Sequence, residues 1–274
     1  MKHKIIRTKQ VSALTPKEAD FLSKLAEKGT SIFTFEQAQA LWTPHERVPD
    51  ALYRLAQKGW LCRLKPGVYL LIPLEADPGR AWTGNSWEIA QYLTSPAVIA
   101  YWSALRYWNL TEQIPQVTFV QTKHPPRHSA EIAGMKFRFV TVIERHFFGS
   151  VPVNISGKTI QIADREKTLI DCASRPELSG GILQLAQALR SNQTQIHWEK
   201  LDQYLRQWGG GAAVKRLGYL VETLKIPGQA DRLARWQSLT TRGICPLEPG
   251  ANKIGIVLTR WQLRVNVSIP ENQM

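Results

Sequence analysis

Two carboxylates, Asp164 and Glu166, carry the strongest suggestion of catalytic chemistry in this chain. Together with the tripeptide FGS at 148–150 they imitate the Gly-Ser then Asp-x-Glu order of nucleotidyltransferases, where two carboxylates on one face of a strand bind Mg²⁺. The residue between them is Arg and the one after them is Lys, where such a strand would be apolar, and a helical pattern begins at Asp164. Helical positions two residues apart do not face each other. We therefore expect Asp164 to cap a helix and Glu166 to favour its positive dipole end, and keep a Mg²⁺-dependent nucleotidyltransferase as an alternative.

Metal and nucleophilic chemistry have little support elsewhere. The cysteines, Cys62, Cys172 and Cys245, lie far apart, which fits neither a disulfide framework nor a zinc or redox pair and indicates a reducing, cytoplasmic compartment. His124 and His128 bracket two prolines, without acidic or thiol neighbours. We predict no catalytic residue, no metal and no cofactor, so the chain is not expected to be an enzyme.

Recognition of DNA is a better-supported chemistry. Apolar residues recur at i, i+3, i+4 and i+7 within 47–58, which predicts a helix with one buried face. The opposite face and the segment that follows carry residue types that contact bases and phosphates. These candidate DNA-binding residues are Arg47, Asp50, Tyr53, Arg54, Gln57, Lys58, Arg63 and Lys65. Arginine can bond guanine and glutamine can bond adenine, whereas Tyr53 and Lys58 suit the backbone. The alternative is a solvated face on which Arg47 and Arg54 only pair with Asp50.

The candidate DNA-binding residues lie in, or just after, the third of three predicted helices. Thr15 and Glu18 form a capping box for a helix at 16–28. Thr34 can cap a second, short helix, and a turn at 43–46 then leads to the third helix. The spacing of these elements is typical of a helix-turn-helix protein.

The pattern changes after Gly59. Two extended segments, WLCRL and VYLLI, flank Pro66-Gly67, which is typical of a type II turn. Three helices followed by a hairpin predict a winged helix-turn-helix, in which the third helix enters the major groove and the hairpin contacts the backbone or minor groove.

From Trp87 onward helices and strands are mixed, which predicts a larger α+β domain after the winged helix. Helices are predicted at 87–93, 98–108, 164–174, 180–190, 197–207, 212–224 and 230–238, and extended stretches at 117–121, 136–143 and 151–162. Gly209–Gly211 is interpreted as a loop between two helices. A last extended run, 254–267, is expected to rejoin the sheet.

Length and charge narrow the class of protein. The 274 residues suit two domains, and proline and glycine between 73 and 84 predict a linker between a DNA-binding domain at 1–78 and a larger domain at 85–274. The net charge is +13, of which 13 basic and 8 acidic residues give residues 1–80 a share of +5. An excess of this sign indicates a polyanionic partner, foremost nucleic acid. Without an apolar run of about 18 residues we expect neither export nor a membrane partner.

Three stretches resemble a known family: RLKPGVYLL at 63–71, SALRYWNL at 103–110 and IADREKTLIDCASRPELSGG at 162–181. Over nearly its whole length the chain resembles AbiEi-type antitoxins of type IV toxin–antitoxin (abortive infection) systems. The resemblance implies a transcriptional autorepressor that binds inverted repeats in its own promoter DNA. It also implies a larger domain that counters a nucleotidyltransferase-like toxin, without a stable complex between the two proteins.

The polar residues of the second and third stretches are candidates for an antitoxin surface. On the predicted helix Leu169 and Ile170 face the core, which leaves the polar residues toward solvent or neighbours and lets Lys167 pair with Asp171. The candidate antitoxin-surface residues are Ser103, Arg106, Asp164, Arg165, Glu166, Lys167, Asp171 and Arg175. Ser103 either lines a pocket with Arg106 or lies at the edge of the core. A non-catalytic RNA-binding module is a third interpretation, because the charge beyond residue 80 is not explained by the third helix.

Overall fold

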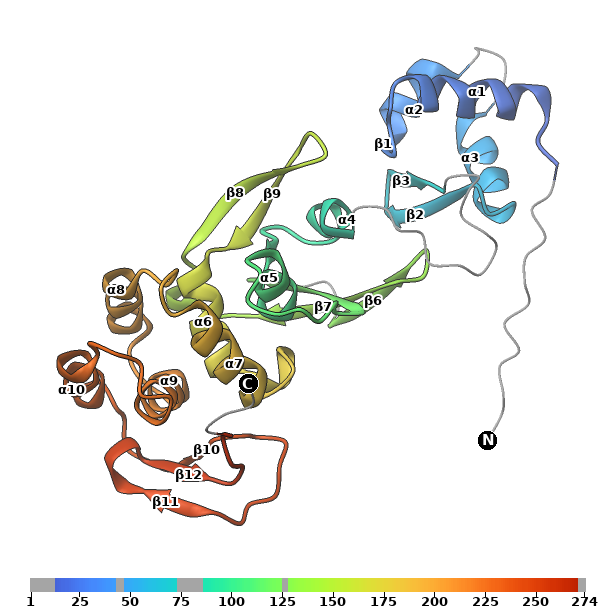
Figure 1. Ribbon diagram of the computed structural model, residues 1–274. Coiled ribbons are helices and arrows are strands. Elements are labelled where there is room, and N and C mark those ends of the chain that lie inside the picture. Colours follow the sequence, from blue (N-terminus) through green and yellow to red (C-terminus); the bar gives the residue numbers. More distant parts are fainter. Residues whose placement is uncertain (1–12, 43–46, 73–85, 125–127, 271–274) are drawn as a thin grey trace, which may run out of the picture. The chain divides into compact units, whose positions relative to one another are not determined.

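The computed structural model describes residues 13–42, 47–72, 86–124 and 128–270, and the fold is α+β (Figure 1). The chain forms two compact units. The first contains Met1–Ser95 with Ser129–Phe137, and the second contains Pro96–His128 with Arg138–Met274. The turn expected at 43–46 and the linker expected between 73 and 84 lie outside the described residues.

The described residues of the first unit form four helices, of which the first two begin where the capping signals predict. They are α1 (Pro16–Glu27), α2 (Phe35–Leu41), α3 (Val48–Gln57) and α4 (Ser86–Leu93). Thr15 and Glu18 form the expected capping box, and Thr34 forms a second one with Gln37. Pro49 lies in the first turn of α3, where its missing N–H leaves no helical hydrogen bond unmade.

The predicted hairpin is present, and it belongs to a three-stranded antiparallel sheet. Its strands are β1 (Ile32–Thr34), β2 (Leu61–Lys65) and β3 (Val68–Leu71), in the order β1-β3-β2. Gly67 has a φ of +74°, as the third position of a type II turn requires. Strand β1 was not predicted, because three residues between two helices are too few to show the alternating pattern of a strand.

Buried side chains lie on both faces of this sheet. One side chain set, including Phe33 and Leu61, packs with Phe21 of α1 and with Leu52 and Leu55 of α3. Each such burial contributes about 1.5–3 kcal/mol to stability. On the other face Leu64 and Leu70 are also buried, and α4 packs against β2. The winged helix is thus held as one body from both sides.

The main sheet has six strands in the order β6-β7-β5-β4-β9-β8. They are β4 (Val98–Ile99), β5 (Val117–Thr122), β6 (Ser129–Ile132), β7 (Met135–Thr141), β8 (Ser150–Ile155) and β9 (Lys158–Ala163). Two expectations were wrong here. The stretch 151–162 is a hairpin that turns at Ser156 and Gly157, and the helix expected from residue 98 starts at Tyr101, because Val98 and Ile99 pair in the sheet.

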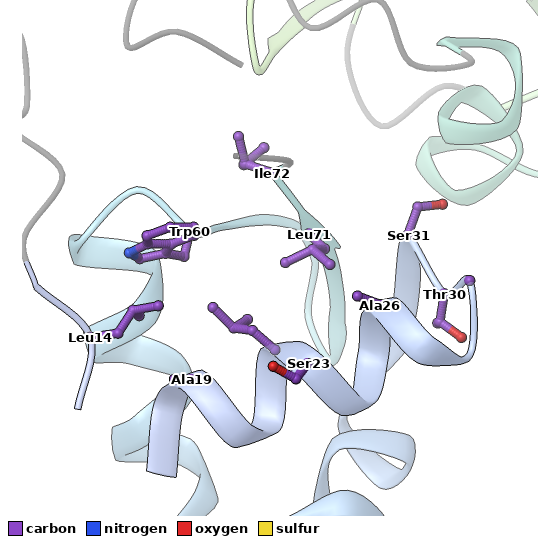
Figure 2. Close-up of a pocket in the computed structure, with 11 residues that line it drawn as sticks. Leu14, Ala19, Ser23, Ala26, Thr30, Ser31, Trp60, Leu71 and Ile72 are labelled. Atoms are coloured by element: carbon purple, nitrogen blue, oxygen red, sulfur yellow. The ribbon is translucent and has the colours of Figure 1, made fainter. Parts of the chain in front are cut away.

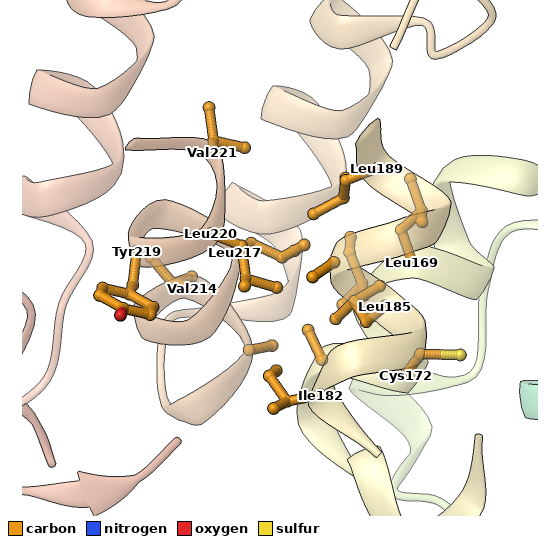
Figure 3. Close-up of a cluster of buried hydrophobic side chains, with 14 of the residues drawn as sticks. Leu169, Cys172, Ile182, Leu185, Leu189, Val214, Leu217, Tyr219, Leu220 and Val221 are labelled. Carbon is orange, nitrogen blue, oxygen red and sulfur yellow. The ribbon is translucent and has the colours of Figure 1, made fainter. Parts of the chain in front are cut away.

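Helices pack against one another to form the core of the second unit. They are α5 (Tyr101–Tyr107), α6 (Arg165–Ser174), α7 (Ile182–Asn192), α8 (Trp198–Trp208), α9 (Ala212–Thr223) and α10 (Ala230–Ser238). Leu169 of α6, Leu185 of α7 and Leu217 of α9 meet in this core (Figure 3). Gly209–Gly211 form the predicted loop between α8 and α9.

The last extended run does not rejoin the main sheet, and that expectation was wrong. It folds back on itself as β11 (Ile256–Leu258) and β12 (Leu263–Val265), which form a separate sheet with β10 (Cys245–Pro246) in the order β10-β12-β11. A 3₁₀ turn, Thr259–Trp261, reverses the chain. Its Trp261 is fully buried against Gly218 of α9, where an added Cβ would lie 2.2 Å from the indole ring. Among the described residues no helix is long and apolar enough to span a membrane.

Candidate nucleic-acid interface

The outward face of α3 is polar and solvent-exposed. Arg47, Asp50, Arg54 and Gln57 are exposed, and 65% of the Tyr53 surface is accessible. The opposite, apolar face of the helix is buried in the core of the first unit. The helical period therefore separates the two faces as predicted and leaves a continuous polar stripe for a partner.

The hairpin that follows α3 adds two exposed cations, Arg63 and Lys65, while Leu64 between them is buried. The strand register shifts between these two cations. The hairpin's turn is tied to the start of α2, because the Phe35 amide donates to the Gly67 carbonyl at 2.8 Å. The two basic side chains consequently lie on a wing whose turn is anchored to the helix-turn-helix.

Glu18 fastens the start of α1 to the end of α3. Its buried carboxylate accepts from Lys58 Nζ at 2.6 Å and from the Thr15 amide at 2.8 Å, and Arg54 Nε lies 3.6 Å from it. Burial alone would raise the pKa of Glu18, but the hydrogen bonds from Lys58 and Thr15 hold this pKa below its ordinary value. Lys58 also donates to the Ala13 carbonyl at 3.0 Å. Of the predicted DNA-binding residues, Lys58 and Arg54 therefore both have charges that interact with the buried Glu18, and Lys58 makes the shorter contact.

An apolar cavity of about 540 Å³ lies along α1 (Figure 2). Leu14 and Trp60 lie at one end of it, Thr30 and Ser31 at the other, and Leu71 of β3 faces α1 across it. It is lined by Leu14, Ala19, Leu22, Ser23, Ala26, Gly29, Thr30, Ser31, Trp60, Leu71 and Ile72. Sequence reasoning missed this cavity, because its walls come from segments about fifty residues apart.

The carboxylates of the 162–181 stretch lie in a buried cluster that joins α6 to α8. Asp164 caps α6 by accepting from the Lys167 amide at 2.9 Å, and it also accepts from Tyr204 Oη at 2.8 Å. Lys200 Nζ lies 3.0 Å from Asp164 and 3.3 Å from Glu166. Burial and the bond to Asp164 raise the pKa of Tyr204 to about 12. The predicted cap is confirmed, and both carboxylates are ion-paired at a helix start.

Lys167 and Asp171 form the predicted pair, but both side chains are fully buried. Burial raises the pKa of Asp171, although the Lys167 ammonium opposes this shift. The same ammonium lies 5.3 Å from the centre of the Phe148 ring and 5.1 Å from that of the Trp208 ring. Two aromatic faces and one carboxylate thus replace water around this cation.

Five of the eight candidate antitoxin-surface residues do not lie on the surface, so placing them there was wrong; for Ser103 the other interpretation, a position at the edge of the core, is confirmed. Ser103, Asp164, Glu166, Lys167 and Asp171 are buried. The Lys167–Asp171 pair and the Asp164 cap are local, but other partners of these residues come from distant parts of the chain and leave no local pattern; the Ser103 hydroxyl, for example, accepts from the Phe119 amide at 3.0 Å.

Three of the predicted antitoxin-surface side chains reach the surface. Arg106 and Arg175 are exposed, and Arg175 pairs with Glu177. Arg165 is half-buried, where it donates to the Gln195 carbonyl at 2.7 Å. Among the described residues no group of three His, Cys, Asp or Glu side chains could hold a metal ion.

The segment that holds the polar helix face and the basic wing gives a match to a known family. Residues 20–72 match the AbiEi antitoxin family of transcriptional regulators. This AbiEi segment runs from within α1 to the residue after β3, so it includes every predicted DNA-binding residue.

The fold of nearly the whole chain is similar to that of a solved structure. The crystal structure of the RV2827C protein from Mycobacterium tuberculosis aligns with a TM-score of 0.65 and 17% sequence identity, covering 93% of each chain. At this identity the likeness shows the fold alone. No curated protein matches the chain.

Outside the AbiEi segment, part of the basic excess is used inside the protein. Arg216 is buried and donates to the carbonyls of Ala173 at 2.8 Å and Ser174 at 3.0 Å. Lys215, also buried, donates to the Gly243 carbonyl. These cations neutralise the carbonyl end of a helix and a turn rather than a carboxylate. Net charge therefore overstates how basic the surface of the second unit is.

Proposed function

We propose that this chain is a DNA-binding transcriptional autorepressor and the antitoxin of a type IV toxin–antitoxin system. It binds inverted repeats in its own promoter and counters a nucleotidyltransferase-like toxin, without catalysis of its own. The observation that carries the DNA-binding part is the exposed polar face of α3 beside the basic wing, within the AbiEi segment. Both are the parts with which winged helices bind DNA.

In this proposal α3 enters the major groove. Arg47 and Gln57 reach base edges, where arginine selects guanine and glutamine selects adenine. Arg63 and Lys65 of the wing contact phosphates, and Tyr53 packs against the sugar–phosphate backbone. Arg54 lies near Glu18 at the inner end of α3, which limits the directions in which its guanidinium can point.

The DNA contact is tested by fluorescence anisotropy with a duplex from the upstream promoter, titrated at several salt concentrations. Gln57→Ala removes a base contact and should weaken promoter binding more than binding to random DNA. Arg63→Ala should weaken both and lower the log–log salt slope by about 0.9, the share of one phosphate.

The matched control is Lys28→Ala, an exposed cation at the end of α1. Its salt slope and its preference for the promoter should equal those of the wild type. The proposed docking would be contradicted if promoter affinity were unchanged in both interface variants. It would also be contradicted if Lys28→Ala lowered promoter affinity as much as they do.

For the antitoxin part, we propose that residues 85–274 act in the cytoplasm on the toxin's effect rather than by forming a stable complex. The exposed side chains Arg106 and Arg175 and the half-buried Arg165 are the remaining candidates for that surface. The adjacent gene, if it encodes a nucleotidyltransferase-like protein, supplies the assay: its induction should stop growth, and expression of this chain from an unrelated promoter should restore it.

The design separates the two activities. A Gln57→Ala/Arg63→Ala variant should lose promoter repression but still restore growth. Both substitutions lie in the AbiEi segment, and residues 85–274, to which the antitoxin activity is assigned, are unchanged. Failure of the wild-type chain to restore growth would refute the antitoxin part and leave a DNA-binding regulator.

A further inference from the structure

The edge of the C-terminal sheet exposes a cluster of large apolar side chains. Ile254 is 82% exposed, Ile256 75% and Val257 40%. The last two belong to β11, which is an edge strand because the sheet has the order β10-β12-β11. An edge strand presents one row of backbone groups without a neighbour in its sheet, and exposed apolar residues on it favour pairing with another strand.

The two faces of β11 differ in chemistry. Ile256 and Leu258 stand opposite Val265 and Leu263 of β12, so they share the face on which Leu263 is fully buried. Leu258 and Val265 pack against the core, whereas Ile256 continues the same row beyond it. A strand added beside β11 would therefore bury Ile256 if it placed apolar residues on this face.

The other face is cationic. Val257 stands opposite Arg264, whose Nη1 donates to the Lys253 carbonyl at 2.9 Å. Lys253 is exposed, whereas Arg260, just after β11, is ion-paired with Glu222 at 3.2 Å and does not add to this face. A strand that paired with β11 would complement this face with carboxylates.

These charges also decide against a second copy as the occupant. The segment 252–260 of a second copy contains Lys253 and Arg260 but no carboxylate. A second copy of β11 would therefore bring no negative charge to the cationic face, and opposite charges are the pairs that stabilise neighbouring strands. The arrangement favours an acidic partner.

We propose that β11 is a docking edge for an extended segment of another polypeptide in which apolar and acidic residues alternate. The apolar residues cover Ile256 on one face, the acidic ones meet Arg264 and Lys253 on the other, and backbone hydrogen bonds join the strands. This surface shares no residue with the α3 face and wing, so it stands independently of the DNA-binding proposal.

The test uses the full chain and a fluorescein-labelled peptide of alternating glutamate and valine, with binding measured by anisotropy. Ile256→Asp should weaken binding about tenfold or more, as expected when one isoleucine is no longer covered. Lys253→Glu should also weaken it. The matched control is Ile114→Asp, which alters another isoleucine that is 69% exposed, and it should bind like the wild type.

Further probes make the result decisive. A peptide of alternating lysine and valine should not bind, and N-methylation of alternate amides in the glutamate peptide should abolish binding. Absence of glutamate-peptide binding, or equal loss in Ile256→Asp and Ile114→Asp, would overturn the proposal. Self-association that Ile256→Asp removes in sedimentation, or displacement of the peptide by oligouridylate, would also overturn it in favour of a second copy or RNA. Circular dichroism melting shows that each variant is folded.

Discussion

Glu18 illustrates how one buried carboxylate can organise a small DNA-binding domain. It lies at the start of α1, yet Lys58 reaches it from the end of α3 across forty residues of sequence. Without that cation the carboxylate would be buried with less compensation, which is costly. We therefore attribute to Lys58 a role in the stability of the AbiEi segment besides the DNA contact predicted for it.

The stability role predicts the effect of removing the ammonium. Lys58→Met should lower the free energy of unfolding by about 2 kcal/mol, the range for a hydrogen bond to a charged group. Lys24→Met, which removes an exposed ion pair with Asp20 on the same domain, should cost less than about 1 kcal/mol. Urea denaturation at neutral pH measures both, and equal losses in the two variants would contradict the role.

The lowered pKa of Glu18 predicts the sign of a pH effect. Because its carboxyl is more acidic in the folded than in the unfolded protein, the ionised form stabilises the fold. This contribution is complete above the ordinary pKa of glutamate and is lost as the pH falls through the lowered value. Unfolding free energy measured between neutral and acidic pH should therefore fall more steeply for the wild type than for Glu18→Gln. Parallel curves for the two proteins would show that folding does not lower the pKa of the Glu18 carboxyl.

At the scale of elements, α6 is fixed by charges on both sides of its first two turns. Asp164 and Glu166 hold it to α8 through Lys200, and the Lys167–Asp171 pair lies beneath the rings of Phe148 and Trp208. A buried ion pair of this kind adds little net stability, but breaking it leaves a buried charge. The polar residues of this stretch therefore have a structural explanation.

Double-mutant measurements distinguish these effects. Lys167→Met should destabilise the second unit by about 3 kcal/mol, because Asp171 then lacks its cation. Lys167→Met/Asp171→Leu should recover most of that loss, since no charge remains in the apolar surroundings. Thermal denaturation followed by tryptophan fluorescence reports this unit. If the double variant is no more stable than the single one, the ion pair stabilises the second unit by more than the neutralisation of one buried charge by the other.

Elements with local signals were predicted well, and those defined by distant pairing were not. Capping residues and helical periods located α1, α2, α3 and α6, because a helix makes its hydrogen bonds within itself. Strands β1 and β4 have three and two residues and exist through their neighbours in the sheet. The run 254–267 has the pattern of a strand, but Thr259–Trp261 form a turn, and Trp261 is held by α9 rather than by the main sheet.

The candidate site shows the same division. The exposed face of α3 follows from one helical period, whereas the burial of Asp164 and Asp171 depends on α8 and on tertiary packing. The excess of positive charge was found by counting basic and acidic residues. Such a count does not distinguish Arg63, which is exposed on the wing, from Arg216, which is buried inside the protein. This is why exposure was predicted better for the candidate DNA-binding residues than for the candidate antitoxin-surface residues.

For the molecule as a whole, buried cations should contribute to stability and little to attraction for polyanions. Lys215→Met should lower the melting temperature, because the Gly243 carbonyl loses its donor, but leave the salt concentration for elution from heparin unchanged. Arg63→Ala should have the opposite pattern. A lower elution salt for folded Lys215→Met would show that this lysine's charge acts at the surface.

The contact between Gly218 and Trp261 has a consequence for the order in which the protein can be made. Helix α9 is synthesised first, but its glycine face stays uncovered until residue 261 has been added to the growing chain. The AbiEi segment needs no such late residue among its own core side chains. During translation the winged helix can therefore fold before Trp261, which completes the core of the second unit, has been synthesised.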